Sequence, residues 1–379
     1  MGNCIGRANA TSGGTSGTNR SVRQPDSSHV GRTQDRRDQG GPLAGLSSRN
    51  RATTSRTNEQ VQEQAANVIG RHVRAHIAKP AYQGMRAGIV FSVAPGLLRK
   101  AGLLGPKEAL TVDKLSSINI SRLRKRLGKL NQGEVDFFDR FTRQQFFATH
   151  FTDAKLDHPS SSVSTMSLFS RSKLDQRGIS FNQDNTTHTD RHIKGDQDFV
   201  FFSLECGEEP QKLSSRFGKT LYRVPFDAPV FRQVAWGTLD DIIVDVDEHK
   251  NIDRYIPGLN DAERDVIRKE IGYGRNWRDY LNDPEALNDI FSGEDFIAGT
   301  AFSLISKLRT VNEKLSSLPS SKSAPTAARP LAESLLDSDS AQSMNALLSV
   351  FHRPEIRVPV HFFSSNFEKF TGDELEQMK

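Results

Sequence analysis

The sequence predicts an α+β fold, in which a small and mostly antiparallel sheet lies between helices. Segments with apolar residues at the helical spacing of 3.6 occur near both ends of the 379-residue chain and in its middle. Short apolar runs stand between them, and the strongest is Asp-Phe-Val-Phe-Phe-Ser-Leu-Glu at 198–205. A polar start, poor in aliphatic residues, precedes these segments, so we expect a disordered tail ahead of the folded domain.

This tail, residues 1–57, also carries the chain's excess of positive charge. Of the 51 basic and 46 acidic residues, nine arginines and four acids lie in residues 1–60, which leaves 42 of each sign in the rest of the chain. The folded domain therefore has no basic excess that would support nucleic-acid binding. A short basic arm fits an anionic membrane surface instead.

The first seven residues, Met-Gly-Asn-Cys-Ile-Gly-Arg, match a signal for double acylation. Gly2 can be myristoylated after removal of the initiator methionine, and Cys4 can accept palmitate. Two acyl chains hold a protein stably on a membrane where one does not. Gly6 stands where the motif usually has serine or threonine, and a polar N-terminus that begins Met-Gly by chance is the alternative.

Several other classes of protein are not supported. Cys4 and Cys206 are too few for a disulfide framework or a cysteine-rich zinc site, so a reducing compartment is expected. The longest apolar run, 88–98, is far shorter than the roughly 20 residues that span a bilayer, and no Sec-type signal is present. A His-x-Asp-x-His sequence at 188–192 has no further ligand cluster, so no metal site is predicted.

The folded region is expected to begin with a helix over 58–80 and to continue as one domain over 81–379. Its helices are predicted at 121–130, 134–147, 262–271, 284–291, 294–308 and 340–351, and its strands at 198–205, 220–224, 230–236, 242–246 and 355–363. A polar stretch at 152–197 is interpreted as a long loop of functional or disordered kind. The Ser/Pro/Ala-rich stretch 315–329 is interpreted as a flexible connection.

Five sequence blocks give the first indication of an activity. They are Asp-Phe-Val-Phe-Phe at 198–202, Phe-Gly at 217–218, Gly-Thr-Leu-Asp-Asp at 237–241, a helical block at 290–305, and Leu-Leu-Ser-Val-Phe-His-Arg-Pro-Glu-Ile-Arg-Val-Pro at 347–359. In this order they resemble the OspC/CopC family of bacterial type III effectors. The resemblance implies an ADP-ribosyltransferase-like fold, the use of NAD to modify an arginine of a host protein, in some members by ADP-riboxanation, and a need for host calmodulin.

The resemblance also implies two catalytic positions. Glu355 falls where the family has its catalytic glutamate. A fixed carboxylate there would stabilise the positive charge that builds on the ribose as the nicotinamide bond breaks. Asp241 matches an acidic residue that activates the acceptor arginine, although the adjacent Asp240 could take this role. A solvated glutamate at a strand start is the alternative for Glu355.

Contacts to NAD are implied for six positions, namely His158, Phe199, Phe201, Ser214, Phe217 and Gly218. The two phenylalanines of the strand would line the nicotinamide pocket, and an aromatic face suits a cationic pyridinium. Because alternate phenylalanines on a buried strand are usually core, at least one of the pair is expected to be core. The alternative for His158 is an exposed loop residue.

The helix over 58–80 corresponds to the region through which the family engages calmodulin. Ile69, Val73 and Ile77 would be its apolar anchors and Arg71 and Arg74 its basic contacts. A basic amphipathic helix of this kind is a fair calmodulin target in its own right. A helix that packs its apolar face on the catalytic domain is the alternative.

The chain departs from the family in three places. The family's histidine shortly before the Phe-Gly block is missing from Gln-Lys-Leu-Ser-Ser-Arg at 211–216. Arg353 stands two residues before Glu355, where ordinary arginine-specific transferases have Glu or Gln. The ankyrin repeats by which relatives hold their targets are absent from these 379 residues, so a different target is expected.

Together these features predict a type III effector at the cytoplasmic face of the host plasma membrane. Its predicted activity is the transfer of ADP-ribose from NAD to an unidentified host protein, on arginine, with calmodulin as a partner. Two alternatives remain: a membrane-tethered module that binds calmodulin or another host protein without catalysis, and an NAD glycohydrolase that uses Glu355.

Overall fold

The computed structural model describes residues 89–159, 164–181, 195–239, 252, 259–270, 279–318 and 339–378. All of these residues lie within one compact unit, Thr57–Lys379. Several predictions fall outside the described residues: the tail 1–57, the helix 58–80, the strand 242–246, most of the connection 315–329, and the site residues Gly2, Cys4, Ile69, Arg71, Val73, Arg74, Ile77 and Asp241.

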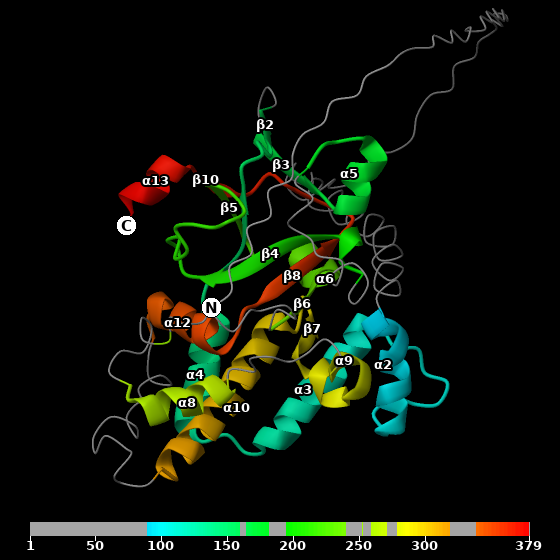
Figure 1. Ribbon diagram of the computed structural model, residues 1–379, viewed down its shortest axis with the longest axis vertical. Coiled ribbons are helices and arrows are strands. Elements are labelled where there is room, and N and C mark those ends of the chain that lie inside the picture. The colour runs from blue at the N-terminus through cyan, green and yellow to red at the C-terminus, as the bar shows by residue number, and fades with distance from the viewer. Residues whose placement is uncertain are drawn as a thin grey trace, which may run out of the picture. The chain divides into compact units, whose positions relative to one another are not determined.

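A seven-stranded sheet forms the centre of the described fold, in the order β10-β5-β1-β4-β8-β6-β7. Every pair of neighbouring strands in it is antiparallel. Its strands are β1 (Phe146–Thr152), β4 (Phe199–Cys206), β5 (Thr220–Pro225), β6 (Trp236–Thr238), β7 (Ile290–Ser292), β8 (Glu355–Pro359) and β10 (Glu368–Phe370). Figure 1 shows helices beside this sheet, and the predicted α+β class is confirmed.

A smaller antiparallel sheet contains β2 (Asp157–Pro159), β3 (Ser164–Phe169) and β9 (His361–Ser364). The predicted strand 355–363 is divided between the two sheets at Val360, which has a φ of 62°. A β-branched residue adopts this left-handed conformation only under constraint. The constraint is a pair of backbone hydrogen bonds, from Val360 N to Asp198 O at 2.7 Å and from Ser170 N to Val360 O at 2.8 Å.

Helices cover the larger sheet, and α3, α4, α8 and α10 gather on one side of it (Figure 1). Their bounds and those of the other helices are α2 (Ile89–Lys100), α3 (Val112–Leu127), α4 (Gln132–Arg143), α5 (Arg171–Arg177), α6 (Pro229–Val234), α8 (Asp261–Glu270), α9 (Asp279–Asn282), α10 (Phe296–Ser316), α12 (Ala341–Phe351) and α13 (Gly372–Gln377). Short 3-10 helices cover Asp196–Asp198 and Pro284–Asp289. None of the helices in the described part of the chain combines the length and apolarity that crossing a bilayer requires.

Two of the three apolar clusters in the described residues make up most of the core. In the larger one the ring of Phe202 lies 5.2 Å from that of Phe231 and 4.9 Å from that of Phe362. The smaller cluster joins α2 to the opposite face of the sheet, where the ring of Trp236 lies 5.2 Å from Phe91 and 5.5 Å from Phe199. These edge-to-face contacts fix the sheet on both faces.

An ion pair ties α10 to the start of α4. The carboxylate of Glu134, 1% exposed, pairs with Arg309, and Arg309 Nη2 lies 2.5 Å from Glu134 Oε2. Arg309 Nη1 also donates to the carbonyl of Leu127 at 2.5 Å. The Asn131 amide donates to the same carboxylate at 2.8 Å, which completes the N-terminal cap of α4. The pair therefore holds the end of α3 and the start of α4 against α10.

Replacing Arg309 by methionine is expected to lower the free energy of unfolding by about 3 kcal/mol, because Glu134 would stay buried without its cation. Chemical denaturation of the full chain measures this loss. The matched control is Arg143→Met, since Arg143 pairs with Asp139 on the exposed face of α4 and should contribute less than about 0.5 kcal/mol. Equal losses in the two variants would contradict the prediction.

Three predicted segments differ from the structure over part or all of their length. The helix predicted at 134–147 ends at Arg143, and Phe146 and Phe147 begin the central strand β1, which is buried on both faces and so reads as a continuous apolar run. The predicted strand 230–236 is mostly helix α6, which starts at Pro229, and only Trp236 belongs to a strand. The predicted helix 284–291 is a 3-10 helix that leads into β7.

The polar stretch 152–197 is not a plain loop. It contains β2, β3 and α5 as well as the 3-10 helix that begins at Asp196. Of the two short strands, β2 pairs with β3, and β3 pairs with β9, which lies about 200 residues further along the chain. Local sequence patterns do not report such distant pairing. The predicted connection 315–329 likewise begins inside α10, which extends to Ser316.

Candidate active site

Glu355 is the first residue of β8, near the middle of the larger sheet. Its cross-strand neighbours are Ser203 on β4 and Thr238 on β6. The side chain is 27% exposed, so the carboxylate is held by the sheet and still reaches solvent. This position suits a group that must act on a bound molecule from a rigid support.

Arg357 lies two residues further along β8 and on the same face, and its side chain is fully buried. Its Nη2 forms an ion pair with Glu355 Oε1. Its Nε lies 3.2 Å from Asp196 Oδ1, and its Nη1 donates to Thr238 Oγ1 at 3.2 Å. One buried cation thus stands between two carboxylates, and the cluster has a net charge of −1 when all three groups are ionised.

Two aromatic rings flank the guanidinium of Arg357. Its central carbon lies 4.8 Å from the ring centroid of Trp236 and 5.4 Å from that of Phe201. Both residues are direct cross-strand neighbours of Arg357. Cation–π attraction of this kind is strongest when the cation is desolvated, as it is here.

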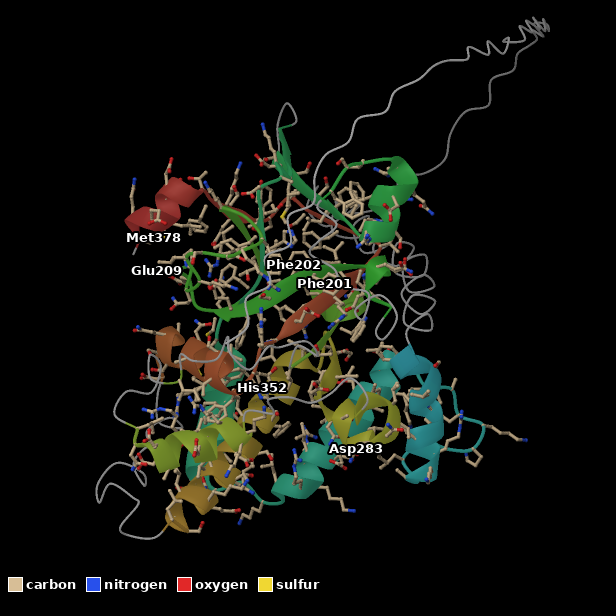
Figure 2. All side chains as sticks on the ribbon, in the orientation of Figure 1. Phe201, Phe202, Glu209, Asp283, His352 and Met378 are labelled. Atoms are coloured by element: carbon tan, nitrogen blue, oxygen red, sulfur yellow. The ribbon has the colours of Figure 1, made fainter. Side chains whose placement is uncertain are left out.

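The two phenylalanines expected at the nicotinamide pocket therefore differ. Phe199 is 2% exposed and belongs to the smaller apolar cluster, where it packs on Trp236. Phe201 is half-buried beside Arg357 and close to Glu355 along the sheet. Figure 2 marks Phe201 and Phe202 on β4, next to β8. Phe201 is the one of the pair that lies near Glu355.

The segment with Ser214, Phe217 and Gly218 leads into β5. Ser214 and Phe217 are exposed, whereas Gly218 is buried with a φ of +152°. A Cβ on Gly218 would lie 2.1 Å from the carbonyl carbon of Thr152, so only glycine fits this close approach. The strand order places β1 and β4 between β5 and β8, so this segment leads into a strand that is not a neighbour of the strand that carries Glu355.

His158 lies in β2, where its backbone pairs with Thr165, rather than in an open loop. The neighbouring Asp157 ties this strand to the larger sheet, because its carboxylate accepts hydrogen bonds from Lys369 Nζ at 2.9 Å and from the Tyr222 hydroxyl at 2.7 Å. The Lys369 contact, followed by the Tyr222 one, lowers the pKa of Asp157 to about 2. This cluster fixes the hairpin of His158 to β5 and β10.

Asp157 gives a prediction on acid stability. Since its pKa is lower in the folded chain, the stabilisation is complete above the unfolded pKa near 4 and is lost as the pH falls towards 2. We expect a contribution of about 1 kcal/mol, because Lys369 is partly exposed and solvent screens the pair. Thermal unfolding of wild type and Asp157→Asn should differ at pH 6 and converge near pH 2. A difference that does not change with pH would contradict the assignment.

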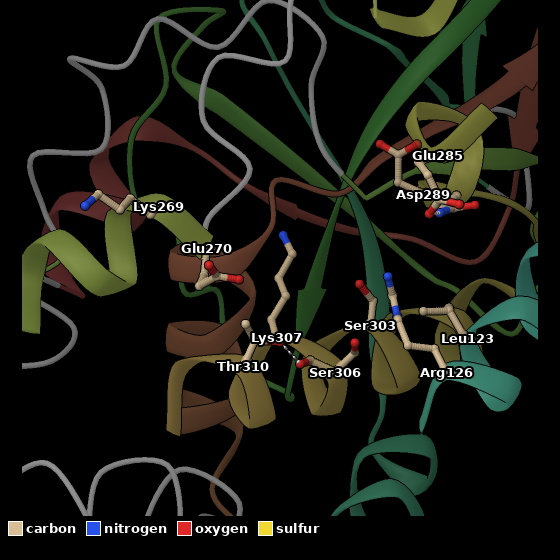
Figure 3. Close-up of a pocket in the computed structure, with 11 residues that line it drawn as sticks. Leu123, Arg126, Lys269, Glu270, Glu285, Asp289, Ser303, Ser306, Lys307 and Thr310 are labelled. Atoms are coloured by element: carbon tan, nitrogen blue, oxygen red, sulfur yellow. Dashed lines mark hydrogen bonds between the residues drawn. The ribbon is translucent and has the colours of Figure 1, made fainter. Parts of the chain in front are cut away.

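A separate cavity of about 340 Å³ lies among α3, α8, α10 and the 3-10 helix before β7 (Figure 3). Lys307 projects into it from α10, and its Nζ donates to Phe351 O at 2.6 Å and lies 3.3 Å from His352 Nδ1. Two backbone hydrogen bonds connect the wall of this cavity with the start of β8. Asp289, which lines the cavity, accepts from the amide of Leu239, and the carbonyl of Leu239 accepts from the amide of Arg353, two residues before Glu355.

Sequence reasoning missed both the cavity and the buried Arg357 cluster. The cavity had a signal, because Ser303, Ser306 and Thr310 form a polar stripe at helical spacing on the otherwise apolar α10. Arg357 had a weaker signal, since it is a charged residue between the apolar Ile356 and Val358 of the strand that Glu355 begins. Its partner Asp196 had none, since it is 161 residues away.

Burial, the larger effect, and the nearby Glu205 raise the pKa of the Cys206 thiol to about 12, so it is not a thiolate at neutral pH. No group of three or more His, Cys, Asp or Glu side chains that could hold a metal ion gathers among the residues that the structure describes.

Comparison with known proteins gives one informative match. No protein-family model matches the chain. The chain is similar to the arginine ADP-riboxanase CopC of Chromobacterium violaceum, with 26% identity over 258 residues, which cover 65% of this chain and 50% of the relative. The chain thus spans about half the length of this curated relative. The resemblance drawn from the sequence is confirmed at this level, and the chain is a distant relative of the CopC family.

Proposed function

We propose that this protein is an ADP-ribosylating enzyme that uses NAD to modify arginine in a host protein. The observation that carries the proposal is Glu355, a partly exposed carboxylate fixed between two strands, which forms with Arg357 and Asp196 a group of three charged side chains with a net charge of −1. The similarity to an enzyme named arginine ADP-riboxanase supports the same chemistry. Both the ribosyl group of NAD and an arginine side chain carry positive charge during such a reaction, so both would be attracted to this site.

The residues fit the nicotinamide end of NAD. When the bond between ribose and nicotinamide breaks, its electron pair leaves with nicotinamide and positive charge builds on the ribose. We assign Glu355 to stabilise that charge and Phe201 to line the same site, since both lie on one face of the sheet. An acceptor guanidine nitrogen then forms the new bond to the ribose carbon. Asp241 or Asp240 would orient the acceptor and take its proton.

The cellular setting is also proposed. Acylation of Gly2 and Cys4 would hold the protein at the cytoplasmic face of the host plasma membrane after delivery as a type III effector. The basic amphipathic sequence at 58–80 would bind calmodulin. The second candidate function is a tethered binding module without catalysis, favoured by the missing histidine before the Phe-Gly block.

The test is incubation of the purified full chain with labelled NAD and a eukaryotic lysate, with and without calmodulin. A labelled protein supports the transferase, and intact-mass analysis then separates ADP-ribosylation from a product lighter by one ammonia, as riboxanation gives. Free ADP-ribose without labelled protein would make it a glycohydrolase. If NAD is not turned over and does not change the melting temperature, the result would favour the second candidate, a binding module without catalysis.

A further inference from the structure

Arg357 has no role in the site as the family resemblance describes it, yet it is the most constrained charged residue next to Glu355. Its side chain is fully buried, and burying an arginine is costly unless its donors are satisfied by close partners. The partners are the Asp196 carboxylate, the Thr238 hydroxyl and Glu355. Glu355 contributes twice, through its carboxylate and through its backbone carbonyl, which lies 3.5 Å from Nη1.

We propose that Arg357 is a positioning residue that fixes the carboxylate of Glu355 for the reaction. The proposal rests on the proposed function, since positioning matters only if Glu355 acts on NAD. The ion pair engages Oε1 of Glu355 and so sets the direction of the carboxylate, while 27% of the side chain remains exposed. The ionised carboxylate is the form that pairs with Arg357 and also the form that stabilisation of a positive ribose requires.

The shape of the guanidinium explains why arginine occupies this position. Nε faces Asp196, Nη1 faces Thr238 and Nη2 faces Glu355, so three edges of one planar group serve three partners. Lysine has a single ammonium on a flexible stem and cannot meet these three directions at once. The ring of Trp236, itself held by Phe91 and Phe199, prevents the guanidinium from swinging away.

The charged groups around Glu355 in the described residues are consistent with this role. Its cross-strand neighbours Ser203 and Thr238 are neutral, whereas Arg357 and, behind it, Asp196 place charged groups next to it. Asp196 balances part of the charge of Arg357 and holds Nε at 3.2 Å. Asp196 and Arg357 thus form a buried support for Glu355, which is the most exposed of the three charged side chains.

The experiment compares wild type, Arg357→Lys, Arg357→Met and the milder Thr238→Val, each as the full chain, in NAD turnover. We expect both Arg357 variants to lower kcat about 100-fold with little change in the KM for NAD, and Thr238→Val to act in the same direction but less. Melting temperatures are measured in parallel. Arg309→Met is the matched control, an ion-paired arginine of α10 whose loss should reduce stability but not kcat at a temperature well below melting.

Two results would overturn the positioning role. One is an Arg357→Lys or Thr238→Val enzyme with the kcat of wild type, and the other is a rise in KM without a fall in kcat, which would mean that Arg357 binds NAD itself. Rescue of kcat in Arg357→Ala by millimolar guanidinium, but not by the same concentration of sodium chloride, supports the positioning role.

A double-mutant cycle of Glu355→Gln and Arg357→Met tests the ion pair without any turnover. Non-additive shifts in melting temperature support the pairing, and additive shifts overturn it. Absence of turnover in wild type defeats the proposed function alone.

Discussion

Replacing Glu355 by glutamine is expected to reduce the rate of NAD turnover at least about 100-fold, while the affinity for NAD stays nearly unchanged. Glutamine keeps the shape of the side chain and its place between Ser203 and Thr238, so the sheet should be preserved. What is lost is the negative charge, and with it the interaction that strengthens as positive charge develops on the ribose. An effect on kcat rather than on binding follows from this difference.

Turnover of labelled NAD gives the rate, and the shift in melting temperature with added NAD gives the binding. The matched control is Glu368→Gln, since Glu368 also pairs with a buried arginine of the same sheet but lies at its edge on β10. Unchanged turnover in Glu355→Gln would assign the reaction to another residue. Loss of NAD protection together with turnover would mean that Glu355 contributes to ground-state binding.

The sequence alone predicts the frame around Glu355 well. The strands β4 and β5 follow the predicted bounds to within one residue, because both are rich in β-branched or aromatic residues. The position of Glu355 at a strand start also follows from the local pattern. The central strand β1 was missed because Phe146 and Phe147 continue the apolar pattern of the preceding helix, and neither a glycine nor a proline separates the two.

The surroundings of Glu355 could not be predicted in the same way. Asp196 comes from a stretch interpreted as a loop, and it meets Arg357 through tertiary structure alone. The aromatic partner Trp236 was placed in a strand without any indication that an arginine would lie over its ring. Contacts of this kind join strands that are distant in sequence, and periodicity reports which face a residue takes but not which strand lies beside it.

A second buried arginine on the same face of the sheet provides a contrast with Arg357. Arg223 on β5 is fully buried, pairs with Glu205 and Glu368, and lies 3.9 Å over the ring of Phe147. It also donates to the carbonyls of Gly207 at 2.6 Å and Glu208 at 2.5 Å. The Glu205 carboxylate in turn accepts from the amides of the next turn, at 2.8 Å and 2.7 Å. Arg223 therefore organises the connection from β4 towards Ser214 and Phe217.

Arg223→Met is expected to lower the free energy of unfolding by about 4 kcal/mol, because Glu205 and the carbonyl of Gly207 stay buried without this donor and the carbonyl of Glu208 loses its hydrogen bond. Denaturant unfolding measures the loss. The double variant with Glu205→Gln should be less destabilised than the sum of the single variants, since the unpaired charge is then also removed. Strict additivity would contradict a direct role for the pair.

The loss should also depend on pH. Burial raises the pKa of Glu205 above its ordinary value, and removing Arg223 takes away a charge that opposes this rise. In the folded variant Glu205 therefore binds a proton more readily than in the unfolded chain. The stability of the variant then falls as the pH rises through the raised pKa of Glu205, so the variant should be more stable at pH 5 than at pH 8. Wild type should show the same trend more weakly, because Arg223 opposes the rise in the pKa of Glu205. An equal pH dependence in the two proteins would contradict this effect of Arg223. Arg223 pairs with Glu205 and Glu368 rather than with Glu355, so Arg223→Met should lower the free energy of unfolding strongly and change kcat little when kcat is measured below its melting temperature. Arg357→Lys should show the opposite pattern, a large fall in kcat.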